Sequence, residues 1–333
     1  MSRLGISIVV ITYNEEKQIE RCISSILKLD YSPLEILIVD ASEDRTGEIV
    51  KSINDTRIRY FSVSSKGYSI QRNIGIRNAR HPLVAFTDAD CTVPADWLSK
   101  LAPIVATSVA GAGGNAFPPK GSKGLGLCIA CLGFPAGGAI GLDANLPNSG
   151  EVILATCNAI FQREILLQIG GFNESLKYGG EDTNICYSIY QAGYEIKYLR
   201  DSYVYHQVRS DILEVSRWCI RRGKANAQLT RKRASSIFWN VLILCFFVLW
   251  LLLASISIVS HGYITLLGSV FLFALSSLIL FTSSKKFRLA WLRRKVIGIG
   301  ILKLLVLVPA LFFMRRLLMA VGGIQLMATK LIE

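Results

Sequence analysis

The sequence predicts an α/β fold, with a mostly parallel sheet flanked by helices, plus C-terminal transmembrane α-helices. From residue 6 to residue 90, β-branched apolar runs alternate with segments of helical periodicity, which is typical of such sheets. The chain has 333 residues and is 51% hydrophobic, and the apolar excess lies after Ile237. The net charge is +13, yet no Asp or Glu occurs between Glu214 and Glu333. We therefore expect a globular N-terminal part and a membrane-bound C-terminal part.

The first strands are predicted at residues 6–12, 35–39 and 58–63, because these runs are rich in Ile and Val. Between them, apolar residues at positions 19, 22, 23, 26 and 27 indicate a helix with one buried face, and residues 44–53 and 68–79 also look helical. No Gly-x-Gly-x-x-Gly follows the first strand, and no Gly-Lys-Ser/Thr loop is present. The dinucleotide-binding fold and the phosphate-loop ATPases are therefore disfavoured.

The central strand is predicted in the apolar run at residues 83–90, which ends in two carboxylates, Asp88 and Asp90. Oxygen ligands of this kind favour Mg²⁺ or Mn²⁺, which usually share their coordination shell with substrate phosphates. The alternative is an acidic turn that caps a helix. Because ligands of parallel sheets bind beyond the carboxyl ends of the strands, Thr12, Asp40 and Asp88 should converge in one crevice.

The middle of the chain is glycine-rich. Gly111, Gly113 and Gly114 suggest a close backbone approach to a bound ligand, and residues 125–141 form an apolar, glycine-broken segment. We expect this segment to pack in the core, with a dip into the membrane surface as the alternative. The eight cysteines show no paired framework, so buried reduced thiols are expected; Cys128 and Cys131 lack a second pair that would suggest zinc.

Residues 238–257 and 263–281 are each about long enough to cross a bilayer and are predicted to form a transmembrane hairpin. Residues 296–320, interrupted by Lys303 and Pro309, form either a third span or an interfacial helix. Lys and Arg residues flank the hairpin on both outer sides, so the N-terminal domain should be cytoplasmic. The basic segment at 211–236 then fits anionic membrane lipids better than nucleic acid.

Several motifs resemble, in order and spacing, those of the family 2 glycosyltransferases, enzymes with the GT-A fold. The resemblance extends from about residue 6 to residue 206. It is carried by residues 8–15, 39–46, 71–75, 86–90, 156–161, 170–173 and 180–183. It implies a catalytic domain at residues 1–210. The basic and apolar stretches that follow predict an interfacial helix or linker at 211–236 and a membrane domain at 237–333.

The resemblance also implies roles for individual residues. Asp182 would be the catalytic base, and a late metal-ligating histidine would be His206, which could otherwise simply end a strand. Asp40 is followed by Ala-Ser-Glu, where the family often has an acidic residue and Gly-Ser, so the nucleobase stays open. The nucleotide-sugar site would comprise Thr12, Tyr13, Asn14, Glu15, Asp40, Arg72, Asp88 and Glu181, and the Mg²⁺ or Mn²⁺ ligands would be Asp88, Asp90 and His206.

The sequence therefore predicts an integral membrane, inverting glycosyltransferase. It would transfer a sugar from a nucleotide-diphosphate sugar donor to a hydroxyl of a lipid-linked acceptor in the membrane. Two alternatives stay open: transfer to a polyprenyl or dolichyl phosphate, and a non-catalytic nucleotide-binding membrane subunit.

Overall fold

The computed structural model describes residues 3–105, 109–122, 125–133, 152–209, 211–229 and 299–332, with a few isolated positions between 247 and 291. The chain divides into two compact units. The N-terminal unit comprises Met1–Gly121 and Gly133–Gln207, and the helical unit comprises Ser122–Leu132 and Val208–Glu333. Each unit is described by itself below.

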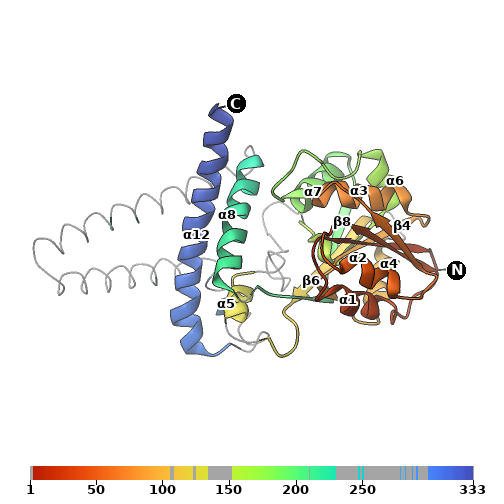
Figure 1. The fold of residues 1–333 in the computed structure, drawn as a ribbon, viewed down its shortest axis with the longest axis horizontal. Helices are drawn as coiled ribbons and strands as arrows, with labels where there is room; N and C mark the ends of the chain where they lie inside the picture. The colour runs from red at the N-terminus through yellow and green to blue at the C-terminus, as the bar shows by residue number, and fades with distance from the viewer. Residues whose placement is uncertain are drawn as a thin grey trace, which may run out of the picture. The chain divides into compact units, whose positions relative to one another are not determined.

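The N-terminal unit is an eight-stranded mixed sheet with helices on both faces (Figure 1). The strand order is β3-β2-β1-β4-β7-β6-β8-β5. The strands are β1 (Ile6–Thr12), β2 (Leu34–Asp40), β3 (Ile58–Ser62), β4 (Leu83–Asp88), β5 (Cys91–Thr92), β6 (Val109–Phe117), β7 (Ala159–Gln162) and β8 (Glu195–His206). The helices are α1 (Ile19–Ile26), α2 (Thr46–Ser52), α3 (Tyr68–Asn78), α4 (Trp97–Val105), η1 (Thr156–Asn158), α6 (Arg163–Gln168) and α7 (Glu181–Gln191).

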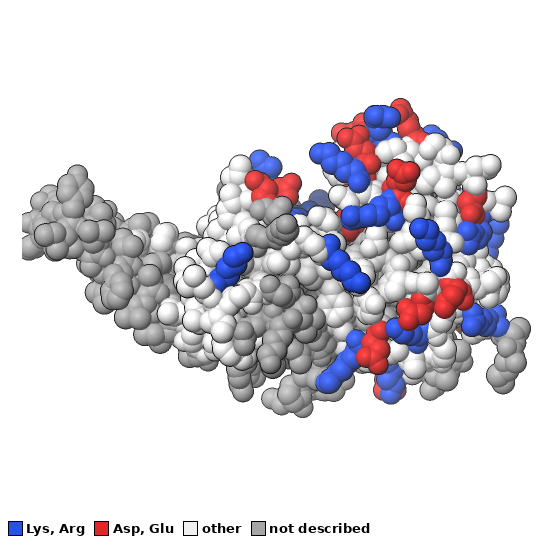
Figure 2. All heavy atoms as spheres, turned by 90° about the horizontal axis from the view of Figure 1, so that it is seen from below, with Lys and Arg blue, Asp and Glu red and all other residues white. Residues whose placement is uncertain are grey.

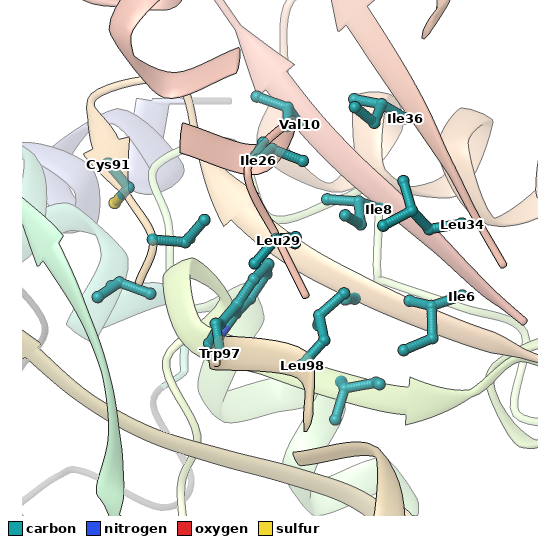
Figure 3. Close-up of a cluster of buried hydrophobic side chains, with 14 of the residues drawn as sticks. Ile6, Ile8, Val10, Ile26, Leu29, Leu34, Ile36, Cys91, Trp97 and Leu98 are labelled. Atoms are coloured by element: carbon teal, nitrogen blue, oxygen red, sulfur yellow. The ribbon is translucent and has the colours of Figure 1, made fainter. Parts of the chain in front are cut away.

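The first four strands form the parallel half of the sheet, as the alternation of strands and helices predicts. β1, β2 and most of β4 are buried throughout, so their apolar residues contact helices on both faces. On one face, alternate β1 residues Ile6, Ile8 and Val10 pack with Ile26 and Trp97 from α1 and α4 (Figure 3). On the other face, the intervening β1 residues pack with residues of α3, α6 and α7. The parallel strands are thus held with their carboxyl ends at one edge.

The other half of the sheet is mixed, because β6 and β8 are parallel and the remaining pairs are antiparallel. β7 is antiparallel to both β4 and β6, and β5 is antiparallel to β8. The glycines of β6 also have a different role from the predicted approach to a ligand. A Cβ at Gly111 would overlap the Phe161 ring, and one at Gly114 would overlap the Ser202 carbonyl oxygen. These glycines therefore allow neighbouring strands of the sheet to pack closely.

The helical unit contains α5 (Leu125–Cys131), α8 (Ile212–Gln228) and α12 (Ile301–Ile332). α8 and α12 lie side by side (Figure 1). Their backbones approach closely at two glycines, because a Cβ at Gly223 would overlap the Met319 carbonyl and a Cβ at Gly322 would overlap the Ile220 carbonyl. Arg315, near the middle of α12, donates a hydrogen bond to the Leu132 carbonyl oxygen at 3.2 Å. The start of the apolar segment predicted at 125–141 therefore packs in this unit.

One described helix is long and apolar enough to cross a membrane, over Ile301–Thr329 with a mean hydropathy of 2.1. The helix continues to Ile332, beyond the predicted segment at 296–320, and Arg315 and Arg316 lie near its middle. The predicted spans at 238–257 and 263–281 lie almost entirely outside the described residues. Seven of the eight cysteines are described, and all seven are buried and form no disulfide bond, as expected.

Candidate active site

The carboxyl ends of three parallel strands bring together three of the predicted site residues. Thr12 pairs with Asp40 in the β1–β2 register, and Ile11 pairs with Asp88 in the β1–β4 register. Thr12 and Asp40 are each 3% exposed. The Thr12 hydroxyl is buried and has no hydrogen-bond partner among the described residues, which suits a group that meets a ligand. Three neighbouring strands therefore place these residues at the same edge of the sheet.

The loop after β1 is bonded to the loop after β2. The Asn14 amide donates to Ser42 Oγ at 2.7 Å, and Asn14 Oδ1 accepts from the Glu43 amide at 2.9 Å. The Glu15 amide donates to Thr46 Oγ1 at 2.9 Å. Asn14 holds a left-handed conformation with φ of 57°, which asparagine tolerates better than most residues. These bonds fix one wall of the site.

Tyr13 follows the last residue of β1 and is 43% exposed. Lys66 Nζ lies 4.6 Å from the centre of its ring and 3.0 Å from its hydroxyl, and it also pairs with Glu43 at 2.6 Å. No role for Lys66 or Glu43 could be predicted from the sequence. Their contacts hold an aromatic face at the rim of the crevice, where a planar base could stack.

Asp40 is held by two groups of the protein. Oδ1 accepts from the Ser42 amide at 2.9 Å, and Oδ2 accepts from the Tyr60 hydroxyl at 2.7 Å. Burial and this hydrogen bond raise the pKa of Tyr60 to about 12, so the phenol stays a donor. A Cβ at Gly47 would lie 2.5 Å from the Tyr60 oxygen, so glycine is needed to admit the pair. A carboxylate has about four lone-pair sites, which leaves Asp40 capacity to accept from a base.

Asp88, Asp90 and His206 form a cluster in which one ligand atom from each lies within 4.8 Å of the others. His206 Nε2 is 3.8 Å from Asp88 Oδ2 and 3.6 Å from Asp90 Oδ1. Strand β5 holds the cluster together, because Cys91 pairs with His206 and the Gln207 amide donates to the Asp90 carbonyl at 3.0 Å. Asp88 and His206, which are 118 positions apart in sequence, are thereby brought close together.

The donor set of this cluster fits a divalent cation. His206 Nδ1 lies 2.9 Å from the Gln207 carbonyl oxygen, which can only accept, so Nδ1 carries the proton and Nε2 carries the lone pair. That arrangement is typical of metal-ligating histidines. Two carboxylates and one imidazole suit Mn²⁺ or Mg²⁺. The residues present therefore fit the predicted metal.

Arg72 connects this cluster to helix α7. Its guanidinium is almost fully buried and donates to Asp88 Oδ1 at 3.1 Å and to Glu181 Oε1 at 2.9 Å. Although burial lowers the pKa of Arg72, the two carboxylates raise it above its ordinary value. Burial raises the pKa of Asp88. The charge of Arg72 lowers this pKa, whereas the charge of Asp90 raises it further. With Asp182, whose charge also raises the pKa of Arg72, three carboxylates act on one guanidinium, so the site favours an added cation.

Asp182 lies in the first turn of α7, after Gly180, which has φ of 94°. Its Oδ1 accepts a hydrogen bond from the Thr156 hydroxyl at 2.6 Å. Burial and the Asp182 charge raise the pKa of the neighbouring Glu181. Thr156 belongs to a motif seen in the sequence, but only the structure gives it this partner. The two neighbouring acids thus differ: Glu181 is buried against Arg72, and Asp182 is more exposed and bonded to a hydroxyl.

Comparison with known proteins identifies the family. Residues 7–170 match the family model described as glycosyl transferase family 2. The protein belongs to this family. Its sheet is also similar to that of a mannosyltransferase from Pyrobaculum calidifontis solved with GDP-Man and Mn²⁺. That similarity has a TM-score of 0.59 and 19% identity and covers 99% of this chain and 89% of the other, which establishes the GT-A fold.

Three curated relatives are informative. An uncharacterized glycosyltransferase of Bacillus subtilis, EpsJ, is 39% identical over 29% of this chain, and the match spans only 29% of that relative. The succinoglycan biosynthesis protein ExoM of Rhizobium meliloti is 26% identical over 72% of this chain and 80% of its own length. A dolichyl-phosphate hexose transferase of Haloferax volcanii is 29% identical over 30% of this chain and 42% of its own length. The chain thus matches less than half of the length of two of these relatives and most of the length of the third.

Proposed function

We propose that this glycosyltransferase moves a sugar, with inversion, from a nucleotide-diphosphate sugar to a hydroxyl of a membrane-embedded acceptor. The acceptor would be a lipid-linked saccharide or glycolipid at the cytoplasmic face. The observation that supports this most directly is the arrangement of Asp182. Its carboxylate accepts from Thr156, while the two hydrogen bonds of Arg72 go to Asp88 and Glu181. Asp182 can therefore receive a proton beside the metal-ligand cluster.

In the proposed reaction, the acceptor oxygen attacks the anomeric carbon on the side opposite the diphosphate. The bond from that carbon to the phosphate oxygen breaks, and the nucleoside diphosphate leaves. The acceptor hydroxyl passes its proton to Asp182, which acts as general base. A base in this position contributes roughly 10²–10⁴-fold to the rate.

The metal would be held by Asp88, Asp90 and His206. A bound Mg²⁺ or Mn²⁺ supplies positive charge that stabilises the leaving diphosphate. The buried guanidinium of Arg72 donates a hydrogen bond to Asp88 Oδ1 at 3.1 Å and so orients this carboxylate. On the donor side, Tyr13, Asn14, Glu15 and Asp40 would contact the nucleoside.

Asp182→Asn tests the general-base role. The variant should reduce transfer by roughly 10²–10⁴-fold, because the amide cannot take the proton, while donor binding in the presence of Mn²⁺ stays unchanged. Asp201→Asn, at an exposed position of β8, is the matched control and should keep wild-type activity. If Asp182→Asn instead lost donor affinity with no separate effect on turnover, Asp182 would be a binding residue.

A polyprenyl phosphate is the second candidate acceptor, and the similarity to a dolichyl-phosphate hexose transferase favours it. A phosphate acceptor is already ionised, so transfer would depend little on Asp182. Labelled donor, native membrane lipids and detergent-solubilised protein separate the two. A lipid product that loses its label in mild acid identifies a sugar phosphodiester, and an acid-stable product identifies transfer to a hydroxyl. Binding of no donor in a panel of nucleotide sugars would contradict both.

The membrane location rests on the helical unit. α12 exposes several large apolar side chains among the described residues, such as Leu302 at 77% and Val306 at 57%. Helix α8 carries Arg217, Arg221, Arg222 and Lys224, which suit anionic lipid headgroups. By contrast, Figure 2 shows Lys, Arg, Asp and Glu interspersed over the visible face of the N-terminal unit. Membrane lipids are therefore the proposed partners of the helical unit.

A further inference from the structure

Two buried thiols lie beside the histidine of the metal-ligand cluster. Cys91 begins β5 directly after Asp90, and Cys157 is the middle residue of η1. One ligand atom from each of Cys91, Cys157 and His206 lies within 4.8 Å of the others. The three residues are 1%, 3% and 9% exposed. No step of the proposed reaction uses either thiol.

The three residues come from separate elements that the fold holds in place. Cys91 pairs with His206 in the β5–β8 register. Next to Cys157, Asn158 accepts from Trp97 Nε1 at 2.8 Å and donates to the Asn115 carbonyl at 2.7 Å. In Figure 3, Cys91 lies among the core side chains on the sheet face that α1 and α4 cover. A preformed arrangement needs little reorganisation before it can bind a ligand.

The chemistry of this set differs from that of Asp88, Asp90 and His206. Two cysteine sulfurs and one imidazole are ligands that Zn²⁺ and other thiophilic cations prefer, whereas Mg²⁺ and Mn²⁺ prefer oxygen. Burial of small thiols in a core is common and would explain their low exposure. It does not explain why both thiols lie within 4.8 Å of a ring nitrogen of the same histidine.

We propose that Cys91, Cys157 and His206 form a second site, for a thiophilic divalent cation such as Zn²⁺, which competes with the Asp88, Asp90 and His206 site. Both sites require a lone pair of His206, and Nδ1 is protonated because it donates to the Gln207 carbonyl. Nε2 can bond to one cation at a time. Zn²⁺ in the thiol site therefore weakens Mn²⁺ binding and inhibits the enzyme.

Metal titration of the full-length protein in detergent tests the site without any nucleotide sugar. Cys128 and Cys131 are first replaced by Ser, to remove the other close pair of thiols. Cd²⁺ should then produce one equivalent of thiolate-to-metal absorption. Cys157→Ser should weaken this binding at least about tenfold, since loss of even an outer-shell partner costs a metal site roughly 10–100-fold. Cys186→Ser, at a buried position of α7 outside the cluster, is the control and should bind as the parent does.

A second variant and a second measurement keep the test decisive. Cys91→Ser should weaken Cd²⁺ binding as Cys157→Ser does, so the test survives if one variant misfolds. Electron paramagnetic resonance of bound Mn²⁺ should show its displacement by Zn²⁺ in the parent but not in a folded Cys157→Ser protein. Equal Cd²⁺ absorption in the parent and both variants, or equal Mn²⁺ displacement, would overturn the proposal.

Inhibition of transfer is the one consequence that rests on the proposed function. With saturating Mn²⁺, Zn²⁺ should inhibit the parent at a concentration at least about tenfold lower than it inhibits Cys157→Ser. The two proposals can fail separately. Absence of transfer with every donor would remove the proposed function, while the Cd²⁺ and Mn²⁺ results would still decide the thiol site.

Discussion

Arg72 neutralises more buried charge than any other residue of the described site, because one guanidinium serves two carboxylates from different elements. Arg72→Met leaves Asp88 and Glu181 without their cation, and breaking a buried pair in this way costs about 3–5 kcal/mol. We expect a loss of this size in urea unfolding. Arg77→Met, in the same helix but exposed, should cost less than about 1 kcal/mol.

A double variant separates charge from packing in this prediction. Arg72→Met combined with Glu181→Gln removes one of the uncompensated acids and should recover part of the lost stability, since the two side chains are in contact. If the two effects simply added, Arg72 would contribute through packing alone.

Thr156 is expected to act through Asp182. Thr156→Val removes the hydroxyl that donates to Asp182 Oδ1, so the carboxylate loses its orientation. A misplaced catalytic group costs up to about 100-fold in rate, and we expect kcat to fall by about this factor while KM for the donor is unchanged. Thr156→Ser retains the hydroxyl and should have near wild-type kcat. A fall in kcat for Thr156→Ser but not for Thr156→Val, which keeps the methyl group, would show that the methyl group and not the hydrogen bond matters.

Asp55 gives a pH-dependent prediction. Hydrogen bonds from Arg57 lower its pKa from 3.8 to about 2. A lowered pKa in the folded state stabilises the protein above the ordinary pKa, and the contribution is lost as the pH falls toward the folded value. The melting temperature of wild type should therefore exceed that of Asp55→Asn at pH 5, and the difference should shrink toward pH 2. A difference that is constant with pH would exclude this linkage.

At the scale of elements, the packing of α8 on α12 depends on two glycines. Gly322→Ala places a methyl group against the Ile220 carbonyl oxygen, so the helices must move apart. Overpacking of this kind costs about 1–3 kcal/mol, and the protein should become more sensitive to proteolysis within the helical unit. Gly323→Ala is the matched control, because its nearest atom, the Gly223 carbonyl oxygen, is at 3.8 Å. Equal protease sensitivity of the two variants would contradict the close crossing.

The elements that could be predicted from sequence are those whose burial pattern is simple. β1, β2 and β4 are continuous β-branched or apolar runs that stop at Thr12, Asp40 and Asp88, and the structure confirms all three. β6 could not be predicted, because a strand of Val-Ala-Gly-Ala-Gly-Gly lacks the usual side chains. Its glycines are explained only by the strands beside it. The antiparallel β7 was missed for a similar reason, since pairing direction depends on contacts distant in sequence.

The candidate site shows the same division. Asp88 and Asp90 could be found because they end a strand, and the proximity of His206 requires the β5–β8 pairing, which two residues of β5 do not reveal. The partners of the predicted residues could not be read from the sequence: Thr156 for Asp182, Tyr60 for Asp40 and Glu181 for Arg72. Each of these contacts joins separate elements. The roles of the site residues stay predictions until the variants are measured.

At the scale of the whole molecule, the two sources of membrane affinity predict different extraction behaviour. If α12 and the predicted spans are inserted, the protein should remain with membranes after washing with concentrated salt and require detergent for release. If only the basic residues of α8 hold it, salt should release it, because salt screens attraction to anionic headgroups. Sedimentation of washed membranes distinguishes these outcomes, with a known peripheral protein as the control.

The chain passes between the two units more than once, which limits how the N-terminal unit could be transferred to another protein. The chain leaves the N-terminal unit at Gly121, contributes α5 to the helical unit, returns at Gly133 and leaves again after Gln207. One cut therefore cannot release the N-terminal unit intact, since a cut after Gln207 would leave α5 attached to it without α8 and α12. A transferable version must also bridge residues 122–132 with a short loop. It must keep Gln207 as well, whose amide holds Asp90 in place.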